Sequence, residues 1–252
     1  MTKEGLLFHA KHAFMPNSLG YCGPDENGRI KRGIEDGEPD EAFAGALERF
    51  EAAFPFLKLI ARSTGNEVFD YSVPEAYWIG NSLLDRIPAA EFRSFSHREL
   101  RGKDPREVDR MFKGLGGAKP HHTFYVLSTY AASNATDGPN PSNESERKLT
   151  TLIDGCRISW GRVIGVEAKE LQVERRPVML AEGSLSLGPV EVRRVSYNRG
   201  VSPFGGVKAG DVVSIHWGYA CEVLTRRQGI NIEKRTADDL RSMNRYLSSR
   251  PG

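Results

Sequence analysis

The sequence predicts an α+β fold, in which a mainly helical N-terminal domain precedes a small β-barrel with a C-terminal helix. Between residues 43 and 115, apolar side chains recur every three or four residues, which is the period of a helix face. Between residues 162 and 217, short β-branched segments alternate with glycine and proline, as in small barrels. After Leu224 the spacing is helical again. We expect a helical domain over 1–133, a linker over 134–145 and a barrel domain over 146–252.

The composition excludes several classes of protein. The 252 residues are 39% hydrophobic and 27% charged, which is ordinary for a soluble globular protein. The 35 basic and 33 acidic residues give a formal net charge of +2 and no case for nucleic-acid binding. No apolar run is long enough for a membrane span or a signal peptide, so we expect a cytoplasmic protein without membrane contact. Its three cysteines should be thiols, available for metal or for chemistry.

The first 37 residues are rich in turn formers, and residues 15–25 should form a structured loop because they contain proline, asparagine and Gly-Pro. This region places His9, His12 and Cys22 within fourteen residues, although the spacing matches no standard zinc pattern. Two interpretations of Cys22 stay open. It is either a buried cysteine in a turn or a functional thiol, serving as an extra metal ligand or as a nucleophile.

Four helices are expected next. Asp40 is a suitable N-cap for the first, whose apolar face extends to Leu57; Pro55 must end or kink this helix or begin a new one. Pro74 opens the second, which carries an apolar face to Ile87. The third covers residues 91–101, and the fourth starts at Asp104-Pro105. Helices with such aromatic faces can pack into a helical domain.

Two adjacent histidines, His121 and His122, follow Pro120 and precede an apolar run. Neighbouring residues point in different directions on regular elements, so both could bind one metal only on irregular backbone. Each histidine is therefore either a metal ligand or an ordinary hydrogen-bonded residue at a helix N-terminus.

The clearest linker lies at residues 134–143, which are polar and contain two prolines and a glycine. A short helix over 144–153 should lead into the barrel. Thr236 is a candidate cap for the C-terminal helix.

One barrel strand and one junction carry the candidate chemistry. From Val212 to Trp217, alternation places Val213, Ile215 and Trp217 on the core face and His216 on the opposite face. Cys156 follows a glycine at a helix-to-strand junction, where a rigid scaffold can hold an accessible functional side chain. The alternative is a small buried thiol and a surface histidine bonded to a carbonyl.

Two motifs resemble those of the HypC/HybG class of nickel-iron hydrogenase maturation chaperones. Residues 156–163, Cys-Arg-Ile-Ser-Trp-Gly-Arg-Val, are similar to the family's opening Cys-Leu-Ala-Ile-Pro-Gly-Arg-Val. Residues 207–220 are similar to the family's Val-Lys-Pro-Gly-Asp-Tyr-Val-Leu-Val-His-Val-Gly-Phe-Ala, including Lys208, Gly210, Asp211 and His216. The resemblance covers about the last hundred residues. Residues 1 to about 140 resemble an uncharacterised bacterial family, which supplies no chemistry.

The resemblance implies an OB-like barrel in which Cys156 and His216 carry iron with its cyanide and carbon monoxide ligands. A thiolate suits soft, low-valent iron, and an imidazole can bind or orient what the iron carries. The partner would be the hydrogenase large subunit or another maturation protein. The N-terminal domain would then supply partner recognition, or extra ligands from Cys22, His121 and His122. Two departures stand out, because the family's cysteine follows the initiator methionine and the family lacks a large N-terminal domain.

Two other functions are weighed against this one. The first is an enzyme whose Cys22-centred N-terminal domain makes or modifies a small ligand that the barrel delivers. The second is a pure binding module, including one for nucleic acid, as OB folds often are. The near-neutral charge argues against the second.

Overall fold

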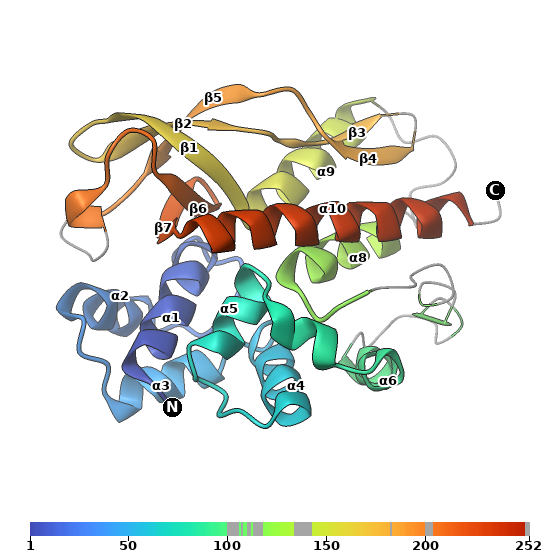
Figure 1. The fold of residues 1–252 in the computed structure, drawn as a ribbon, viewed down its shortest axis with the longest axis horizontal. Coiled ribbons are helices and arrows are strands. Elements are labelled where there is room, and N and C mark those ends of the chain that lie inside the picture. Colours follow the sequence, from blue (N-terminus) through green and yellow to red (C-terminus); the bar gives the residue numbers. More distant parts are fainter. Residues whose placement is uncertain are drawn as a thin grey trace.

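The computed structural model describes residues 1–99, 106, 108–109, 112, 118–133, 143–181, 183–199 and 204–249. A helical N-terminal part lies below a layer of strands, and one long C-terminal helix runs between the two (Figure 1). The predicted α+β fold is confirmed. Residues 134–142 of the predicted linker and most of the helix expected from Asp104 lie outside the described residues, while residues 143–145 of that linker belong to a helix.

The N-terminal region is more helical than its turn formers predict. Helix α1 spans Lys3–Ser18 and α2 spans Asn27–Asp36, so the loop is confined to the residues between them. Helix α1 is buried on several sides at once, which leaves little amphipathic periodicity to find in its sequence. Its N-cap is Thr2, whose hydroxyl accepts from the Gly5 amide at 3.1 Å.

The helices expected between residues 40 and 101 are present but divided differently. Asp40 caps α3 (Glu41–Glu48) as predicted, and α4 (Phe54–Thr64) begins beside Pro55. The predicted continuous helix over 74–87 is wrong. Helix α5 (Ser72–Trp78) ends before Gly80, whose φ of 91° suits glycine, and a 3-10 turn η1 (Ser82–Arg86) follows.

Further helices follow in the described part of the chain. Helix α6 covers Ala89–Glu99, α8 covers His122–Ser133 and α9 covers Asn143–Cys156. The C-terminal helix α10 spans Arg226–Ser248 and starts at a capping box formed by Thr225 and Gln228. The prediction that Thr236 caps it is wrong, since Thr236 is buried inside the helix.

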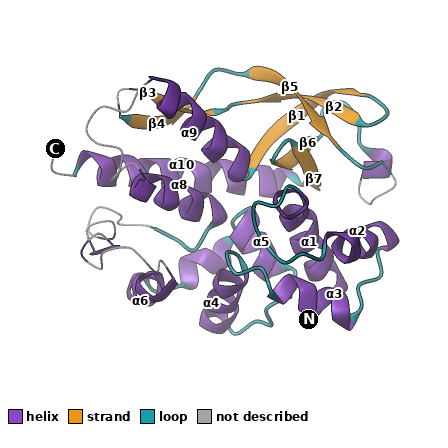
Figure 2. Ribbon diagram, turned by 180° about the vertical axis from the view of Figure 1, so that it is seen from behind, coloured by secondary structure: helices purple, strands orange, loops and turns teal. Residues whose placement is uncertain are grey.

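Five strands close into a barrel in the order β1-β2-β5-β7-β6. They are β1 (Ser159–Val166), β2 (Glu170–Arg175), β5 (Glu191–Ser196), β6 (Val212–His216) and β7 (Tyr219–Leu224). A separate hairpin pairs β3 (Val178–Ala181) with β4 (Ser184–Leu187), and a 3-10 turn η2 (Phe204–Gly206) lies between β5 and β6. Figure 2 shows these strands from the opposite side.

Two hydrophobic clusters hold the elements together. The smaller fills the barrel and includes Val163, Val173, Val213 and Ile215. The larger runs from α1 through α8 and α9 to α10, and so unites residues on both sides of the predicted linker. None of the helices in the described ranges is long and apolar enough to cross a membrane.

Candidate metal centre

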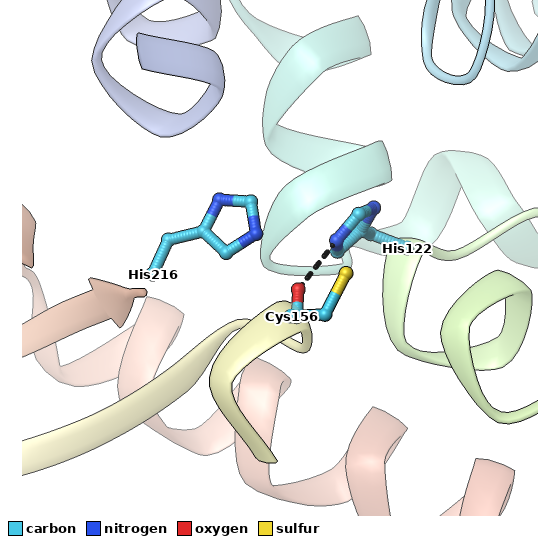
Figure 3. A group of neighbouring side chains, drawn as sticks. All are labelled: His122, Cys156 and His216. Carbon is cyan, nitrogen blue, oxygen red and sulfur yellow. Dashed lines mark hydrogen bonds between the residues drawn. The ribbon is translucent and has the colours of Figure 1, made fainter. Parts of the chain in front are cut away.

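Three metal-ligating side chains from three separate elements meet where the helical part touches the barrel. His122 begins α8, Cys156 ends α9 and His216 ends β6. One potential ligand atom of each lies within 4.8 Å of the others, and it is the one such group of histidine, cysteine or carboxylate residues in the described part of the chain. Figure 3 shows the three side chains turned toward one another.

His216 is oriented as a metal ligand usually is. Its side chain is 1% exposed, and its Nδ1–H donates to the carbonyl of His12 at 2.6 Å. Because Nδ1 carries the proton, Nε2 has a lone pair; it makes no hydrogen bond to a described residue, although the backbone of Cys156 lies close enough to raise the His216 pKa slightly. Burial lowers the pKa of His216 to about 4, so the imidazole is neutral at physiological pH. A backbone carbonyl that fixes the tautomer is a common support for a metal-binding histidine.

His122 lies across from His216, with ring centroids 5.3 Å apart. Its Nε2–H donates to the carbonyl of Cys156 at 2.9 Å, and its Nδ1 accepts from the Tyr77 hydroxyl at 3.0 Å. Burial holds the pKa of His122 well below its ordinary value. Metal binding by His122 would exchange one of these two hydrogen bonds for a metal bond.

Cys156 places its thiol beside the two imidazoles on a half-buried side chain. Burial raises the pKa of this thiol to about 12, and the nearby Cys22 thiol acts in the same direction. The Trp217 indole N–H lies close enough to lower that pKa slightly, although it makes no hydrogen bond to a described residue. Without a cation the thiol is therefore protonated, and a bound metal would favour the thiolate.

The indole of Trp78 forms the floor on which four histidines pack. Ring centroids lie 4.5 Å away for His122, 5.7 Å for His216, 5.6 Å for His9 and 5.7 Å for His12. The Trp78 N–H donates to His9 Nδ1 at 3.0 Å. A rigid aromatic support of this kind limits how far the ligand rings can rotate.

The two α1 histidines have structural partners of their own. His12 bonds the carbonyl of Phe8 at 2.8 Å and the hydroxyl of Ser214 at 3.0 Å. Burial lowers the pKa of both His9 and His12 to about 3, so both are neutral. His12 also presents the carbonyl that orients His216, which makes α1 a supporting element of the site.

His121 and His122 point to different neighbours, as adjacent residues on regular backbone do. His121 Nδ1–H donates to Asp239 of α10 at 2.7 Å, and His121 is not among the three clustered residues. A ligand role for His121 stays a prediction.

Cys22 lies near the cluster without belonging to it. Its charge would interact with those of Cys156, Tyr77 and Tyr125. The loop that carries it is held by Asn17, whose amide donates to the carbonyls of Cys22 at 3.0 Å and Pro24 at 2.7 Å. Burial raises the Cys22 pKa, so the thiol is not activated as a thiolate.

Trp217 covers the cluster and departs from the predicted alternation. Its φ of 50° makes it the one non-glycine residue with positive φ in the described ranges, so its side chain does not continue the core face of β6. A β-carbon on Gly155 would come within 3.1 Å of the Trp217 ring, which explains the glycine there. Tyr21 packs on the outer side, with ring centroids 4.3 Å apart.

The three side chains fit a single transition-metal ion. Ligand atoms around a tetrahedral ion are about 3.3–3.8 Å apart for metal–ligand bonds of about 2.0–2.3 Å. Because the ligand atoms lie within 4.8 Å of one another, binding an ion requires a contraction of at most about 1–1.5 Å. The donor set, one sulfur and two imidazole nitrogens, suits iron, zinc, copper or nickel better than magnesium or calcium. The orphaned Nε2 of His216 is the atom that such an ion would satisfy.

Of the residues that meet here, the sequence pairs Cys156 with His216 and leaves His121 and His122 open. It does not point to Tyr77, Trp78 or Trp217 as neighbours of the cluster, and the site roles stay predictions. No short-range pattern marks an aromatic residue as the support of a distant histidine. Two glycines are the sequence signals that bear on the position of Trp217. Gly155 precedes Cys156 and allows close packing, and Gly218 follows Trp217 and allows an unusual φ.

Comparison with known families gives one match. A sequence model described as a family of unknown function (DUF6390) matches residues 1–250. The chain belongs to this family. The DUF6390 match covers the helical part and the barrel together, so the elements that supply His122, Cys156 and His216 all fall within it. No curated protein and no solved structure matches the chain significantly.

Proposed function

We propose that the protein binds one transition-metal ion through His122, Cys156 and His216, and that it acts as an iron-carrying accessory protein. The observation that carries the metal site is the convergence of these side chains around the unpaired Nε2 of His216. A buried imidazole nitrogen without a partner is costly unless a ligand satisfies it. Neutral imidazoles are ready to bind a cation without first losing a proton.

The kind of cargo follows from the resemblance to hydrogenase maturation chaperones. Cys156 and His216 match that family's cysteine and histidine, and they are neighbours in the fold. We infer that the cargo is iron with cyanide and carbon monoxide ligands, carried in the cytoplasm, where the thiol stays reduced. The recipient would be the large subunit of nickel-iron hydrogenase or another maturation protein. His122 would take the third ligand position from the helical part, which the small chaperones lack.

The residues around the cluster would control entry and release. Trp217 lies beside the Cys156 sulfur and also lines a cleft of about 190 Å3 with Gly155 and Gly218. On the other side, Tyr21 covers the Trp217 ring and is 58% exposed. Movement of these two rings would open the cluster to a partner without unfolding the barrel.

Anaerobic reconstitution tests this function. The full chain is loaded with ferrous iron and, separately, with an iron–cyanide–carbon monoxide donor, and bound iron and the infrared stretches are measured. We expect about one iron per chain, and cyanide and carbon monoxide bands that remain after desalting. Cys156→Ala and His216→Ala should lose both, while His97→Ala, in α6, should retain both.

The results discriminate between the three parts of the proposal: the metal site, the cargo and the carrier role. Iron bound equally by wild type and by Cys156→Ala would contradict the metal site. Iron binding that depends on Cys156 but never retains diatomic ligands would support the metal site and contradict the cargo. Failure of the loaded protein to transfer iron to a purified hydrogenase large subunit would contradict the carrier role.

A second candidate function is an enzyme in which Cys22 acts on a small ligand held at the metal centre. The electrostatic coupling of Cys22 to Cys156 favours it, and so does the coordination position that three protein ligands leave open. The raised Cys22 pKa argues against it unless metal binding activates the thiol. Alkylation of Cys22 across pH in the loaded protein decides the matter. A pKa below the ordinary cysteine value supports the enzyme, and an unchanged raised value contradicts it.

A further inference from the structure

A cavity of about 490 Å3 lies at a second junction between the helices and the barrel. Helices α1 and α2 form one wall, and the β1–β2 turn, the end of β5 and the start of β7 form the other. Its volume is in the range of ordinary small-molecule sites, about 300–1,000 Å3. It shares no lining residue with the metal cluster.

Basic side chains dominate the charge of this cavity. Lys11, Lys31, Lys169 and Arg199 line it, against the single lining carboxylate of Glu35. Lys11 is ion-paired with the buried Glu222, and Lys31 lies 3.9 Å from Glu35. Lys169 has no ion-pair partner in the described ranges, and neither does Arg199. Two cations are therefore left for an anionic ligand.

The Arg199 side chain is held in place rather than swinging freely. Its Nε–H donates to the Tyr197 hydroxyl at 3.1 Å, and that hydroxyl donates to the carbonyl of Glu167 at 2.7 Å. The terminal nitrogens of Arg199 remain for a ligand, and a guanidinium is well suited to a planar or tetrahedral anion.

The remaining walls are apolar and aromatic. Phe14, Ile34, Phe204 and Tyr219 contribute to them, and Phe204 packs on Tyr197 with ring centroids 5.9 Å apart. A ligand that satisfies both kinds of wall needs a flat apolar body as well as an acidic group. Flat apolar rings gain from stacking on aromatic side chains beyond the burial of area.

We propose that this cavity binds a small organic acid with an aromatic body, its carboxylate or phosphate directed toward Lys169 and Arg199. The cavity is connected to the metal cluster through one residue. Cys221, which is buried and lines the cavity, contacts the backbone of His216. The proposal does not rest on the metal-binding function, because none of its residues is a ligand of the cluster.

Four probes separate the contributions of ring and charge. 2-Naphthyl phosphate and 2-naphthoate carry both features with different acidic groups, 2-naphthol carries the ring alone, and inorganic phosphate carries the charge alone. Each is titrated into the full chain in EDTA by calorimetry. From typical ligand efficiencies we expect dissociation constants of about 1 mM or tighter for at least one acid. Naphthol and inorganic phosphate should bind at least tenfold more weakly than that acid.

Variants locate the binding site. Lys169→Glu should weaken the better acid at least tenfold, whereas the same charge change at the exposed Lys234 of α10 should leave its affinity within twofold. Ala168→Trp should block the cavity, and Ala181→Trp, on the exposed side of β3, is the matched control. Cys156→Ala should retain binding, which separates this site from the metal centre.

The proposal is overturned if neither acid binds saturably to the wild type, or if Lys169→Glu and Ala168→Trp leave the affinity unchanged. Naphthol binding as tightly as the acids would contradict the role of the two cations. A preference between phosphate and carboxylate identifies which acid the site was built for.

Discussion

At the scale of single residues, the protonation states of Cys156, His122 and His216 differ. This difference makes metal binding depend on the loss of one proton. Burial keeps His122 and His216 neutral at physiological pH, so neither must lose a proton to bind a cation. The same burial raises the pKa of Cys156 to about 12, so its thiol must lose one. Above pH 6 the thiol is the only ligand for which protons compete.

A proton-linked affinity follows. The apparent association constant for Co²⁺ should rise about tenfold per pH unit between pH 6 and 8, because one proton leaves as the thiolate binds. Competition with a chelator of known pH dependence, followed through the sulfur-to-cobalt absorption band, measures the slope. Cys22→Ser should keep the slope near one. A slope near zero in wild type, or its loss in Cys22→Ser, would contradict Cys156 as the only thiolate ligand.

The buried α1 histidines make stability depend on pH in a definite direction. His9 and His12 have pKa values of about 3 in the folded chain, whereas an ordinary solvated histidine has a pKa of about 6.5, so the unfolded chain binds more protons between these limits. Their stabilisation is complete above about pH 6.5 and is lost as pH falls toward 3. At pH 5 the loss approaches about 2 kcal/mol for each histidine.

Urea unfolding of EDTA-treated protein at pH 7.5 and pH 5 checks this dependence. The wild type should be less stable at pH 5 than at pH 7.5. In His12→Gln the difference in stability between these two pH values should be smaller. His97→Gln is the control, because His97 is partly exposed and bonded to Asp109, and it should keep the wild-type difference. Equal stability at both pH values would show that burial does not hold these imidazoles neutral.

At the scale of elements, the sequence predicts a helix or strand correctly where that element has one regular apolar face. It does not predict elements that lack such a face. The alternation in β6 correctly separates Val213 and Ile215, which fill the barrel, from Ser214 and His216, which meet α1. Helix α1 was missed because it buries several faces, and its two histidines read as parts of a loop. The end of β6 was missed because a left-handed φ at Trp217 has no periodic signature.

The junction formed by Trp217 and the loop after α1 should set the rate of metal exchange. Tyr21→Ala removes the outer ring and Trp217→Gly removes the inner one, while glycine also accepts the positive φ at that position. Each variant should release Co²⁺ to excess chelator at least tenfold faster than wild type in stopped-flow absorbance. Tyr21→Phe keeps a ring packed on Trp217 and should match wild type. Unchanged rates in both truncations would place the path elsewhere.

At the scale of the whole molecule, the site exists because distant segments pack together. One hydrophobic cluster contains residues from before and after the predicted linker, and α10 lies between the helices and the strands. Composition and periodicity predicted both halves but not their mutual placement. That placement brings His122 close to Cys156, whereas the adjacent His121 bonds Asp239 instead. No pattern in the sequence specifies which of the two histidines joins the cluster.

Metal should therefore stabilise the chain as a whole. A ligand at 100 times its dissociation constant adds about 2.7 kcal/mol to the folded state, and about 1 kcal/mol shifts the midpoint by about 2–4 °C in a chain of this size. Wild type should melt about 5–10 °C higher with saturating Zn²⁺ than in EDTA by calorimetry, and His122→Ala should show less than half of that shift. A full shift in His122→Ala would remove the helical part from the site.

The most direct test of the metal centre is the X-ray absorption spectrum of the chain loaded with one Zn²⁺. The structure predicts one sulfur at about 2.3 Å and two imidazole nitrogens at about 2.0–2.1 Å, with outer-shell scattering from both rings. Cys156→Ala should lose the sulfur shell, and His216→Ala should lose half of the imidazole scattering. A spectrum without sulfur, with two or more sulfurs, or without imidazole scattering would contradict a centre formed by His122, Cys156 and His216.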